Sequence, residues 1–267
     1  MNTNMYNEPI DYQNNLLHLK IWEIVKTYTH QAWNKRWHYH QELELLYIQD
    51  GFIEVRSQDE FYTLGTGDIL LIGSNQPHVT RKVDENPLTY LVLHFDMKAF
   101  LDATMLTYYR FFNEIDYSFS KLNHFIYANP HIKQHIAQNI ISIYQEMETK
   151  TRGYEMSVRI KVNEILLSML RVAPEYAVWE TERQNVSALH EVIDYINQHL
   201  AENIEMKQVS SLVNMNYYYF SKYFKKMIGL SFKEYVNLQR IKKAERLLLT
   251  EDVNVNLIAD QVLIINI

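Results

Sequence analysis

The hydrophobic pattern changes its period once along the chain, near residue 96. Between about residues 16 and 96, short apolar runs such as 43–48 and 90–95 are separated by turn residues, for example Asp50-Gly51. Several short strands at this spacing are typical of a small β-barrel or sandwich. The first part of the chain is therefore predicted to be an all-β domain over residues 16–96.

Beyond residue 96, apolar residues recur every three to four positions, which predicts amphipathic helices. Asn129 and Pro130 are typical of a helix start, and Pro174 predicts the end of the second long helix. Residues 97–172 are therefore predicted to be helical elements that pack on the barrel or on a second subunit. The polar segment 173–186 that follows is predicted to be a linker.

The last segment, residues 187–267, has the pattern of an all-helical domain. A short helix over 206–213, a turn and a second helix over 217–227 give the arrangement of a helix-turn-helix. Gly229 is suited to end the second helix, and Ser231 with Glu234 forms a capping box for a long helix after it. The chain is thus predicted to be a multi-domain α+β protein.

Composition supports an ordered protein and excludes several chemistries. The 267 residues are 47% hydrophobic and 22% charged, and they include no cysteine. This excludes a disulfide framework and a cysteine nucleophile. The polar N-terminus carries no secretory signal pattern, and no run approaches the roughly 18 apolar residues of a membrane helix. We therefore expect a cytoplasmic protein without a membrane partner.

Charge is distributed unevenly along the chain. Residues 222–246 contain eight basic and two acidic residues, a local charge of +6, whereas the whole chain has a net charge of -6. A basic block on an acidic protein favours binding to a polyanion, although a charged helix surface can also serve only solubility.

The second helix of the helix-turn-helix has an apolar and a polar face. Phe220 and Phe224 are expected to point inward, and Tyr219 is also expected to pack in the core. The polar face combines groups that can contact base edges with cations that can contact phosphates. The predicted contacts with double-stranded DNA are Asn216, Tyr217, Tyr218, Ser221, Lys222, Lys225, Lys226 and Arg240.

A run of fixed spacings in this region resembles the DNA-binding domain of AraC-type (AraC/XylS) transcriptional regulators. The matching residues are Phe224, Lys225, Gly229, Ser231, Phe232, Tyr235, Arg240, Ile241, Ala244, Leu247 and Leu248. The resemblance implies two helix-turn-helix units joined by a long helix, a homodimer and a small-molecule effector. Val255, Ile258, Ala259 and Val262 resemble the start of the second unit. The residues after Val262 depart from the family pattern, so the second unit is expected to be incomplete.

The N-terminal part carries a group of histidines and acids. His38, His40 and Glu44 share one parity, which places them on one face if they lie on a single strand, and His78 could return to that face from a neighbouring strand. With Gly51 and the later Gly and Pro positions, the spacing resembles the cupin signature, in which three histidines and a glutamate can hold a divalent metal.

Two interpretations of this group follow from the resemblance. In the first, His38, His40, Glu42, Glu44 and His78 bind an effector, with no cofactor. In the second, His38, His40, Glu44 and His78 hold a divalent metal, for which imidazole and carboxylate suit Zn, Fe, Mn or Ni alike. Trp33, Trp37 and Tyr47 are expected to line a cleft large enough for a sugar, unless they serve ordinary packing.

The sequence therefore predicts an AraC-type regulator that binds specific DNA under the control of an effector in a cupin-like barrel. A metal-dependent cupin enzyme, an oxygenase or isomerase, is the alternative from another class. The basic helix-turn-helix favours the regulator, because such an enzyme has no use for it, and no catalytic nucleophile stands out. A third hypothesis is a truncated chain that pairs with an intact homologue and lowers its activity.

Overall fold

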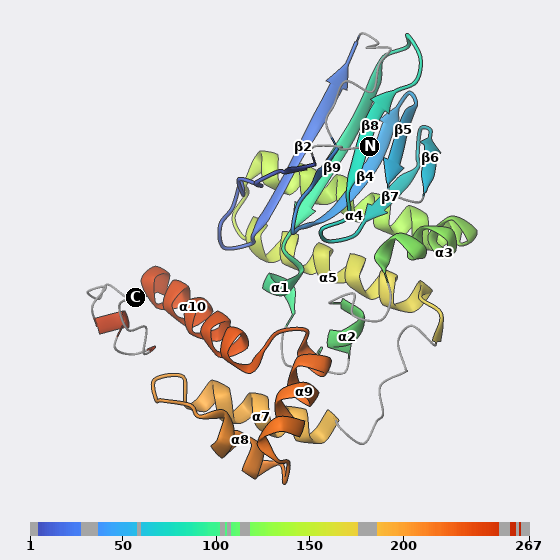
Figure 1. Cartoon of the computed structure of the whole chain (residues 1–267). Helices are drawn as coiled ribbons and strands as arrows, with labels where there is room; N and C mark the ends of the chain where they lie inside the picture. The colour runs from blue at the N-terminus through green and yellow to red at the C-terminus, as the bar shows by residue number, and fades with distance from the viewer. Residues whose placement is uncertain are drawn as a thin grey trace. The chain divides into compact units, whose positions relative to one another are not determined.

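A computed structural model gives the fold of two separate units (Figure 1). It describes residues 5–27, 37–57, 60–101, 105, 108–112, 118–175, 186–250, 257–259 and 262. One compact unit comprises residues 1–100 and 116–177, and the other comprises residues 101–115 and 178–267. The structure thus divides the predicted helical segment 97–172 between the two units.

The first unit contains two β-sheets that face each other. One sheet has the strand order β1-β3-β8-β5-β6, and the other has the order β2-β9-β4-β7. The strands are β1 (Tyr6–Asn7), β2 (Leu19–Lys26), β3 (His38–Tyr39), β4 (Leu43–Asp50), β5 (Ile53–Ser57), β6 (Phe61–Leu64), β7 (Ile69–Ile72), β8 (His78–Lys82) and β9 (Leu88–Phe95). The predicted fold class, α+β with an N-terminal cupin-like barrel or sandwich, is confirmed.

Alternating side chains fill the space between the two sheets. Leu46 and Ile48 of β4 pack with Ile53 and Val55 of β5, and all four are buried. Gly51 makes the tight turn between these strands with a φ of 86°, and a Cβ atom there would lie 2.4 Å from the Pro87 carbonyl oxygen. Only glycine fits this turn without moving the neighbouring backbone.

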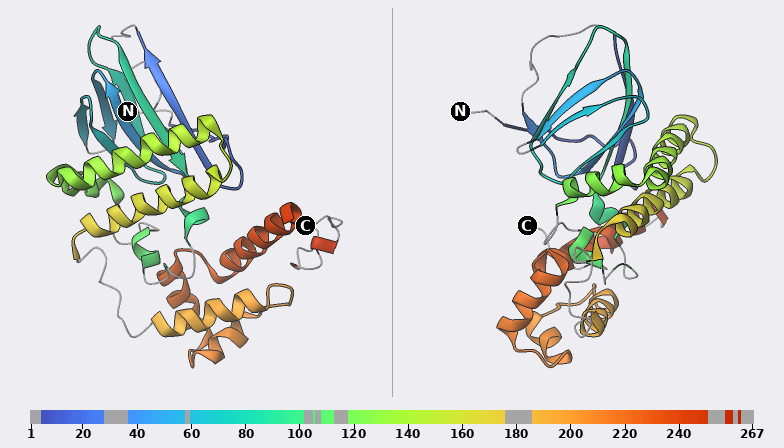
Figure 2. Two further views of the ribbon diagram at one scale, coloured as in Figure 1. Left: turned by 180° about the vertical axis from the view of Figure 1, so that it is seen from behind. Right: turned by 90° about the vertical axis from the view of Figure 1, so that its right-hand side faces the viewer.

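Helices cover one side of this barrel (Figure 2). They are α1 (Met97–Phe100), η2 (Phe119–Lys121), α3 (Leu122–Ala128), α4 (Pro130–Thr149) and α5 (Tyr154–Val172). Helix α4 packs on β2 and β9, and α5 packs on α4. The predicted start of α4 is confirmed, because the Asn129 side chain accepts a hydrogen bond from the Ile132 amide at 3.3 Å.

The second unit is helical in the residues that the structure describes. Its helices are α2 (Tyr109–Phe112), α7 (Val186–Gln198), α8 (Met206–Leu212), α9 (Tyr217–Ile228) and α10 (Phe232–Thr250). Gly229 ends α9 with a φ of 80°, as predicted. The predicted capping box is also present, since the Ser231 amide donates to Glu234 Oε2 at 2.7 Å and the Glu234 amide donates to Ser231 Oγ at 3.3 Å.

The far end of α10 differs from the sequence prediction. The helical period would turn Ile241 and Leu248 inward with the other apolar residues of this helix, but both are exposed. Ile258 and Val262 are buried. Val255 and residues 263–267, on which the prediction of an incomplete second unit depends, lie outside the described residues.

Candidate functional site

A cavity of about 360 Å³ opens between the two sheets of the barrel. Its apolar wall includes Trp22 of β2 and Tyr90 of β9, and its polar wall includes Thr80 of β8. Tyr6 and Glu8, from the N-terminal segment, line it as well. A cavity with apolar walls and a few convergent polar groups is the usual form of a small-molecule site.

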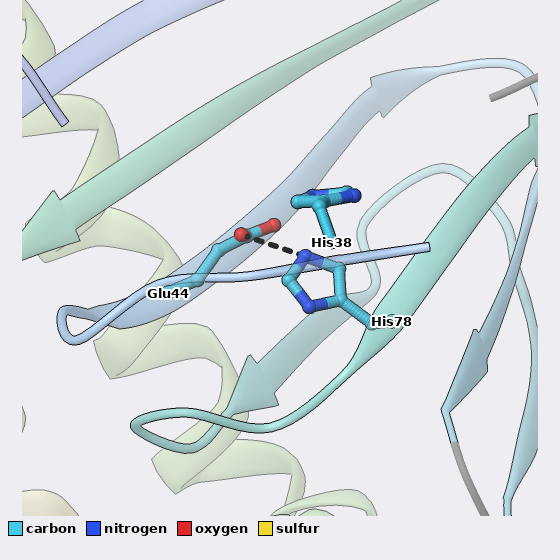
Figure 3. Close-up of side chains that lie close together, drawn as sticks. All are labelled: His38, Glu44 and His78. Atoms are coloured by element: carbon cyan, nitrogen blue, oxygen red, sulfur yellow. Dashed lines mark ion pairs between the residues drawn. The ribbon is translucent and has the colours of Figure 1, made fainter. Parts of the chain in front are cut away.

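Glu44 lies at the polar end of this cavity, surrounded by histidines. Its Oε2 atom is 2.8 Å from His40 Nε2, 2.8 Å from His94 Nε2 and 3.2 Å from His78 Nε2. All four side chains are buried. Figure 3 shows Glu44 and His78 in contact, with His38 beside them. The structure therefore brings two of the predicted histidines, His40 and His78, together with His94 around one oxygen of Glu44.

The route by which these residues meet differs from the prediction. His38, His40 and Glu44 were expected on one strand, but His38 lies on β3 of the five-stranded sheet and Glu44 lies on β4 of the other sheet. The chain crosses between the sheets at residues 40–42, so parity along a single strand does not apply. His38 and Glu44 converge instead because the two sheets face each other across the cavity.

Strand pairing supplies the remaining histidines. His38 on β3 pairs directly with His78 on β8, and Glu44 on β4 pairs directly with His94 on β9. His94 was absent from the sequence prediction. The sequence feature that could have indicated it is the presence of a histidine within the largely apolar run 90–95. Fifty residues separate it from Glu44, so only the β4–β9 pairing shows that they meet.

Other residues predicted for this site lie elsewhere. Glu42 does not line the cavity, because its Oε1 accepts a hydrogen bond from the Tyr12 hydroxyl at 2.7 Å. Trp37 and Tyr47 do not line the cavity either, and Trp33 lies outside the described residues. The aromatic walls come instead from strands β2 and β9, whose inward side chains face the opposite sheet.

Electrostatics keep the Glu44 carboxyl ionised. Burial would raise its pKa, but the charges of His78 and His94, together with contacts to His40 and His78, outweigh that effect and hold the pKa of Glu44 well below its usual range. Burial lowers the pKa of His78, whereas the nearby Glu44 carboxylate raises it, and the net result is a raised pKa. Glu44 is therefore a buried carboxylate that requires positive partners.

The second candidate site is the exposed face of α9. Its start is fixed by Asn216, whose Oδ1 accepts a hydrogen bond from the Tyr219 amide at 2.9 Å. Phe220 and Phe224 are fully buried, as expected, and Tyr218 is 79% exposed. The other predicted contacts on this helix, Tyr217, Ser221, Lys222, Lys225 and Lys226, are exposed or half-buried.

Two residues of this region depart from their predicted roles. Tyr219 is exposed and stacks on Tyr223, rather than packing in the core, because the buried face of the helix is already filled by aromatic side chains. Arg240, predicted to contact DNA, binds the protein's own backbone. Its Nε donates to the Leu200 carbonyl at 3.0 Å and one Nη donates to the Glu202 carbonyl at 2.7 Å.

Comparison with protein-family models decides what kind of protein this is. Residues 23–157, just over half of the chain, match the AraC-like ligand binding domain. Residues 196–237 match the bacterial regulatory helix-turn-helix proteins of the AraC family. The chain belongs to the AraC family of transcriptional regulators. The alternative of a cupin enzyme is therefore set aside.

Relatives of this AraC-family regulator have the same character. It is 22% identical over 229 residues to YdeC of Bacillus subtilis, an uncharacterized HTH-type transcriptional regulator, covering 84% of this chain and 77% of that one. It is 38% identical over 73 residues to the regulatory protein PocR of Salmonella typhimurium, covering 27% of this chain and 24% of that one. Both relatives carry the names of regulators.

Solved structures give weaker likenesses. ToxT from Vibrio cholerae O395 is 11% identical with a TM-score of 0.36, covering 92% of this chain and 88% of that one. A cupin family protein from Methanocaldococcus jannaschii is 20% identical with a TM-score of 0.27, covering 30% of this chain and 71% of that one. In the described part of this regulator, no helix is long and apolar enough to cross a membrane.

Proposed function

We propose that this regulator reads double-stranded DNA through α9, and that a small molecule bound in the barrel cavity controls this binding. The observation that carries the first part is the two-sided character of α9. Buried Phe220 and Phe224 fix one face, while the opposite face presents Tyr218 and three lysines to solvent. A recognition helix needs this combination of a fixed buried side and an exposed polar side. Such a role places the protein with bacterial DNA, in the cytoplasm.

The residues of α9 divide into two groups by chemistry. Tyr217, Tyr218 and Ser221 carry hydroxyl groups that can contact base edges, so they would set sequence preference. Lys222, Lys225 and Lys226 carry positive charge, so they would contact phosphates and supply affinity. Arg240 is left out of both groups, because it binds the Leu200 and Glu202 carbonyls.

The test uses duplexes that the whole 267-residue chain selects from a random-sequence pool. Lys225→Ala should weaken binding to selected and unselected duplexes alike and reduce the slope of log K against log salt by about 0.9, the value for one phosphate contact. Tyr218→Ala should instead reduce the ratio between selected and unselected duplexes. Lys161→Ala, on α5 of the other unit, is the matched control and should change neither quantity. Equal behaviour of the two α9 variants would contradict the proposal.

For the effector, the cavity favours a molecule of about sugar size. Trp22 and Tyr90 offer aromatic surfaces, and Thr80 and the histidines offer hydrogen-bonding groups. Aromatic rings beside polar groups suit a ring with apolar faces and hydroxyl edges. Thermal unfolding of the full chain with a panel of monosaccharides tests this narrower proposal, and Trp22→Leu should abolish any shift that a true effector produces.

We also propose that the regulator is a homodimer, with α5 in the contact. Met156, Ile160 and Leu167 lie on one face of this helix and are 71%, 53% and 41% exposed. Their spacing of four and seven residues forms an apolar stripe of the kind that packs on another helix.

A further inference from the structure

We propose that the helical unit has a small-molecule site of its own, which takes an organic anion with an apolar body. The site is a cavity of about 400 Å³ among the start of α8, the first turns of α9 and the first half of α10, and we call it the helical cleft. That the anion also displaces DNA rests on the function proposed above, whereas the binding of the anion does not.

The floor of the helical cleft is apolar and preformed. Phe232 and Val236 of α10 are buried there, and Ile204 and Met206, around the start of α8, line the cleft as well. The Phe232 ring packs edge to face on Phe224, with ring centroids 5.5 Å apart, so the core of the unit fixes its position. A preformed apolar surface can bind the hydrocarbon part of a ligand without the entropy cost of first ordering side chains.

Arg240 supplies a positive group that is already held in place at the helical cleft. Its Nε and Nη2 atoms donate to the Leu200 and Glu202 carbonyls, which leaves Nη1 with two N–H donors. In the described part of the chain, Nη1 has no hydrogen-bond partner and the guanidinium pairs with no carboxylate. Burial lowers the pKa of Arg240, because partial desolvation disfavours the charged form. An anion in the cleft would supply the missing negative charge.

The other polar groups of the helical cleft also favour an anion. Lys233, Asn237 and Arg240 follow one another at spacings of four and three residues, so they lie on one face of α10. The described residues that line the cleft include no acidic side chain. Glu234, beside Lys233 in the chain, accepts a hydrogen bond from the Ser231 amide at 2.7 Å. Two cations and an amide on one wall, without a lining carboxylate, attract negative charge.

These features together define the class of ligand. A guanidinium with available N–H groups binds a carboxylate through charge-assisted hydrogen bonds. A volume of about 400 Å³ lies near the lower end of the range for small-molecule sites, which suits a ligand of one or two rings. A DNA phosphate has the charge but no apolar body, so it would leave the floor of the cleft uncovered. The helical cleft therefore fits a small organic carboxylate better than it fits the DNA backbone.

The helical cleft shares two side chains with the proposed DNA interface. Tyr217 and Ser221 lie four residues apart on α9, and both line the cleft. They are also two of the three residues proposed to contact base edges. A molecule in the cleft would cover them, so the anion and DNA should exclude each other. Each ligand should then lower the affinity for the other by the same factor.

The first experiment measures anion binding to the whole chain without DNA. Calorimetry compares naphthalene-2-carboxylate with naphthalene-2-carboxamide, which has the same rings but no charge. We expect one carboxylate per chain and at least about tenfold weaker binding of the carboxamide, because hydrogen bonds to charged groups are the stronger ones. Arg240→Lys keeps the charge but loses the fixed N–H groups, so it should also bind the carboxylate at least about tenfold more weakly.

Two further variants keep the result interpretable if Arg240→Lys is poorly folded. Lys233→Ala, at an exposed position, should weaken carboxylate binding about two- to fivefold, as expected for the loss of an exposed charge. Lys207→Ala, exposed on α8 and outside the lining of the cleft, is the matched control and should leave the affinity unchanged. Circular dichroism shows whether each variant is folded.

The second experiment tests the link to DNA. Naphthalene-2-carboxylate should lower the affinity for a duplex selected by the chain, measured by fluorescence anisotropy, and the carboxamide should not. An unchanged DNA affinity at saturating carboxylate overturns the link but not the site. Wild-type protein that binds the two compounds equally, or neither, overturns the site and leaves the DNA interface untouched. Carboxylate binding that is lost in Trp22→Leu and retained in Arg240→Lys places the anion in the barrel and also overturns the site.

Discussion

Asn123 of α3 pairs with Leu71 of β7 through two hydrogen bonds, as a neighbouring strand would. Asn123 Nδ2 donates to the Leu71 carbonyl at 2.8 Å, and the Leu71 amide donates to Asn123 Oδ1 at 2.9 Å. Strand β7 is the edge of its sheet. The side chain thus satisfies backbone groups that an edge strand leaves open, and it ties the helices to the barrel.

Replacing this amide should destabilise the first unit. Asn123→Ala removes two hydrogen bonds and leaves buried backbone groups of β7 without partners, so we expect a loss of about 2–4 kcal/mol in the free energy of unfolding. Urea denaturation followed by circular dichroism measures it. Gln138→Ala, on the exposed side of α4, is the control and should change the value by less than about 0.5 kcal/mol. Similar values for the two variants would show that the Asn123 contact is dispensable.

Two glycines with the same backbone conformation should differ in their tolerance of a side chain. Gly51 and Gly67 both have a φ of 86°, but a Cβ atom at Gly51 would meet the Pro87 carbonyl oxygen at 2.4 Å, whereas one at Gly67 would meet nothing within 4 Å. Gly67→Ala should therefore cost only the left-handed backbone strain, about 1–2 kcal/mol. Gly51→Ala should lower the free energy of unfolding by clearly more, because the backbone of the turn must also move. Equal midpoints in urea for the two variants would contradict this.

The role of Arg240 can be separated from that of a DNA contact by a substitution that keeps its charge. Arg240→Lys cannot reproduce the two directed hydrogen bonds to the Leu200 and Glu202 carbonyls, so the helical unit should lose about 1–3 kcal/mol of stability. Thermal unfolding measures this loss, and the salt slope of DNA binding should stay unchanged. Weaker DNA binding with unaltered thermal stability would indicate instead that Arg240 contacts DNA.

Disrupting the α5 stripe should change the oligomeric state. Ile160→Asp puts a charge in the middle of the stripe at an exposed position, so the chain should remain folded while the proposed dimer dissociates. Sedimentation equilibrium over a range of concentrations gives the mass of each protein. Gln134→Asp, on the exposed side of α4, is the matched control. A wild-type protein that is monomeric at every concentration would contradict the proposed interface.

Local features of the fold could be predicted from the sequence because they depend on neighbouring residues. Asn129 and the Ser231–Glu234 pair cap their helices as expected, since each of these hydrogen bonds spans three residues. The helix-turn-helix and the barrel followed from periodicity in the same way. The amphipathic character of α4 and α5 also followed from the spacing of their apolar residues.

Features that depend on distant parts of the chain were less predictable. His94 reaches Glu44 through strand pairing across fifty residues, and no local pattern encodes that register. The prediction counted alternating positions from His38 to Glu44 as if both lay on one strand. The chain crosses between the sheets after His40, so the two residues lie on different strands. Tyr219 and Ile241 are an aromatic and an apolar residue on helices. Whether such a side chain is buried depends on which other elements of the fold pack against it.

The convergence of three imidazoles on one Glu44 oxygen has a consequence for how this site can change by mutation. Since His40, His78 and His94 all depend on the same carboxylate, their energetic contributions are coupled, and substitutions among them will not add. In a Glu44→Gln background, the negative charge that each histidine contacts is gone. Replacing a histidine should then lower the free energy of unfolding much less than in the native chain. A lineage that lost Glu44 first could therefore lose the histidines one by one. A lineage that kept Glu44 would have to keep all three histidines.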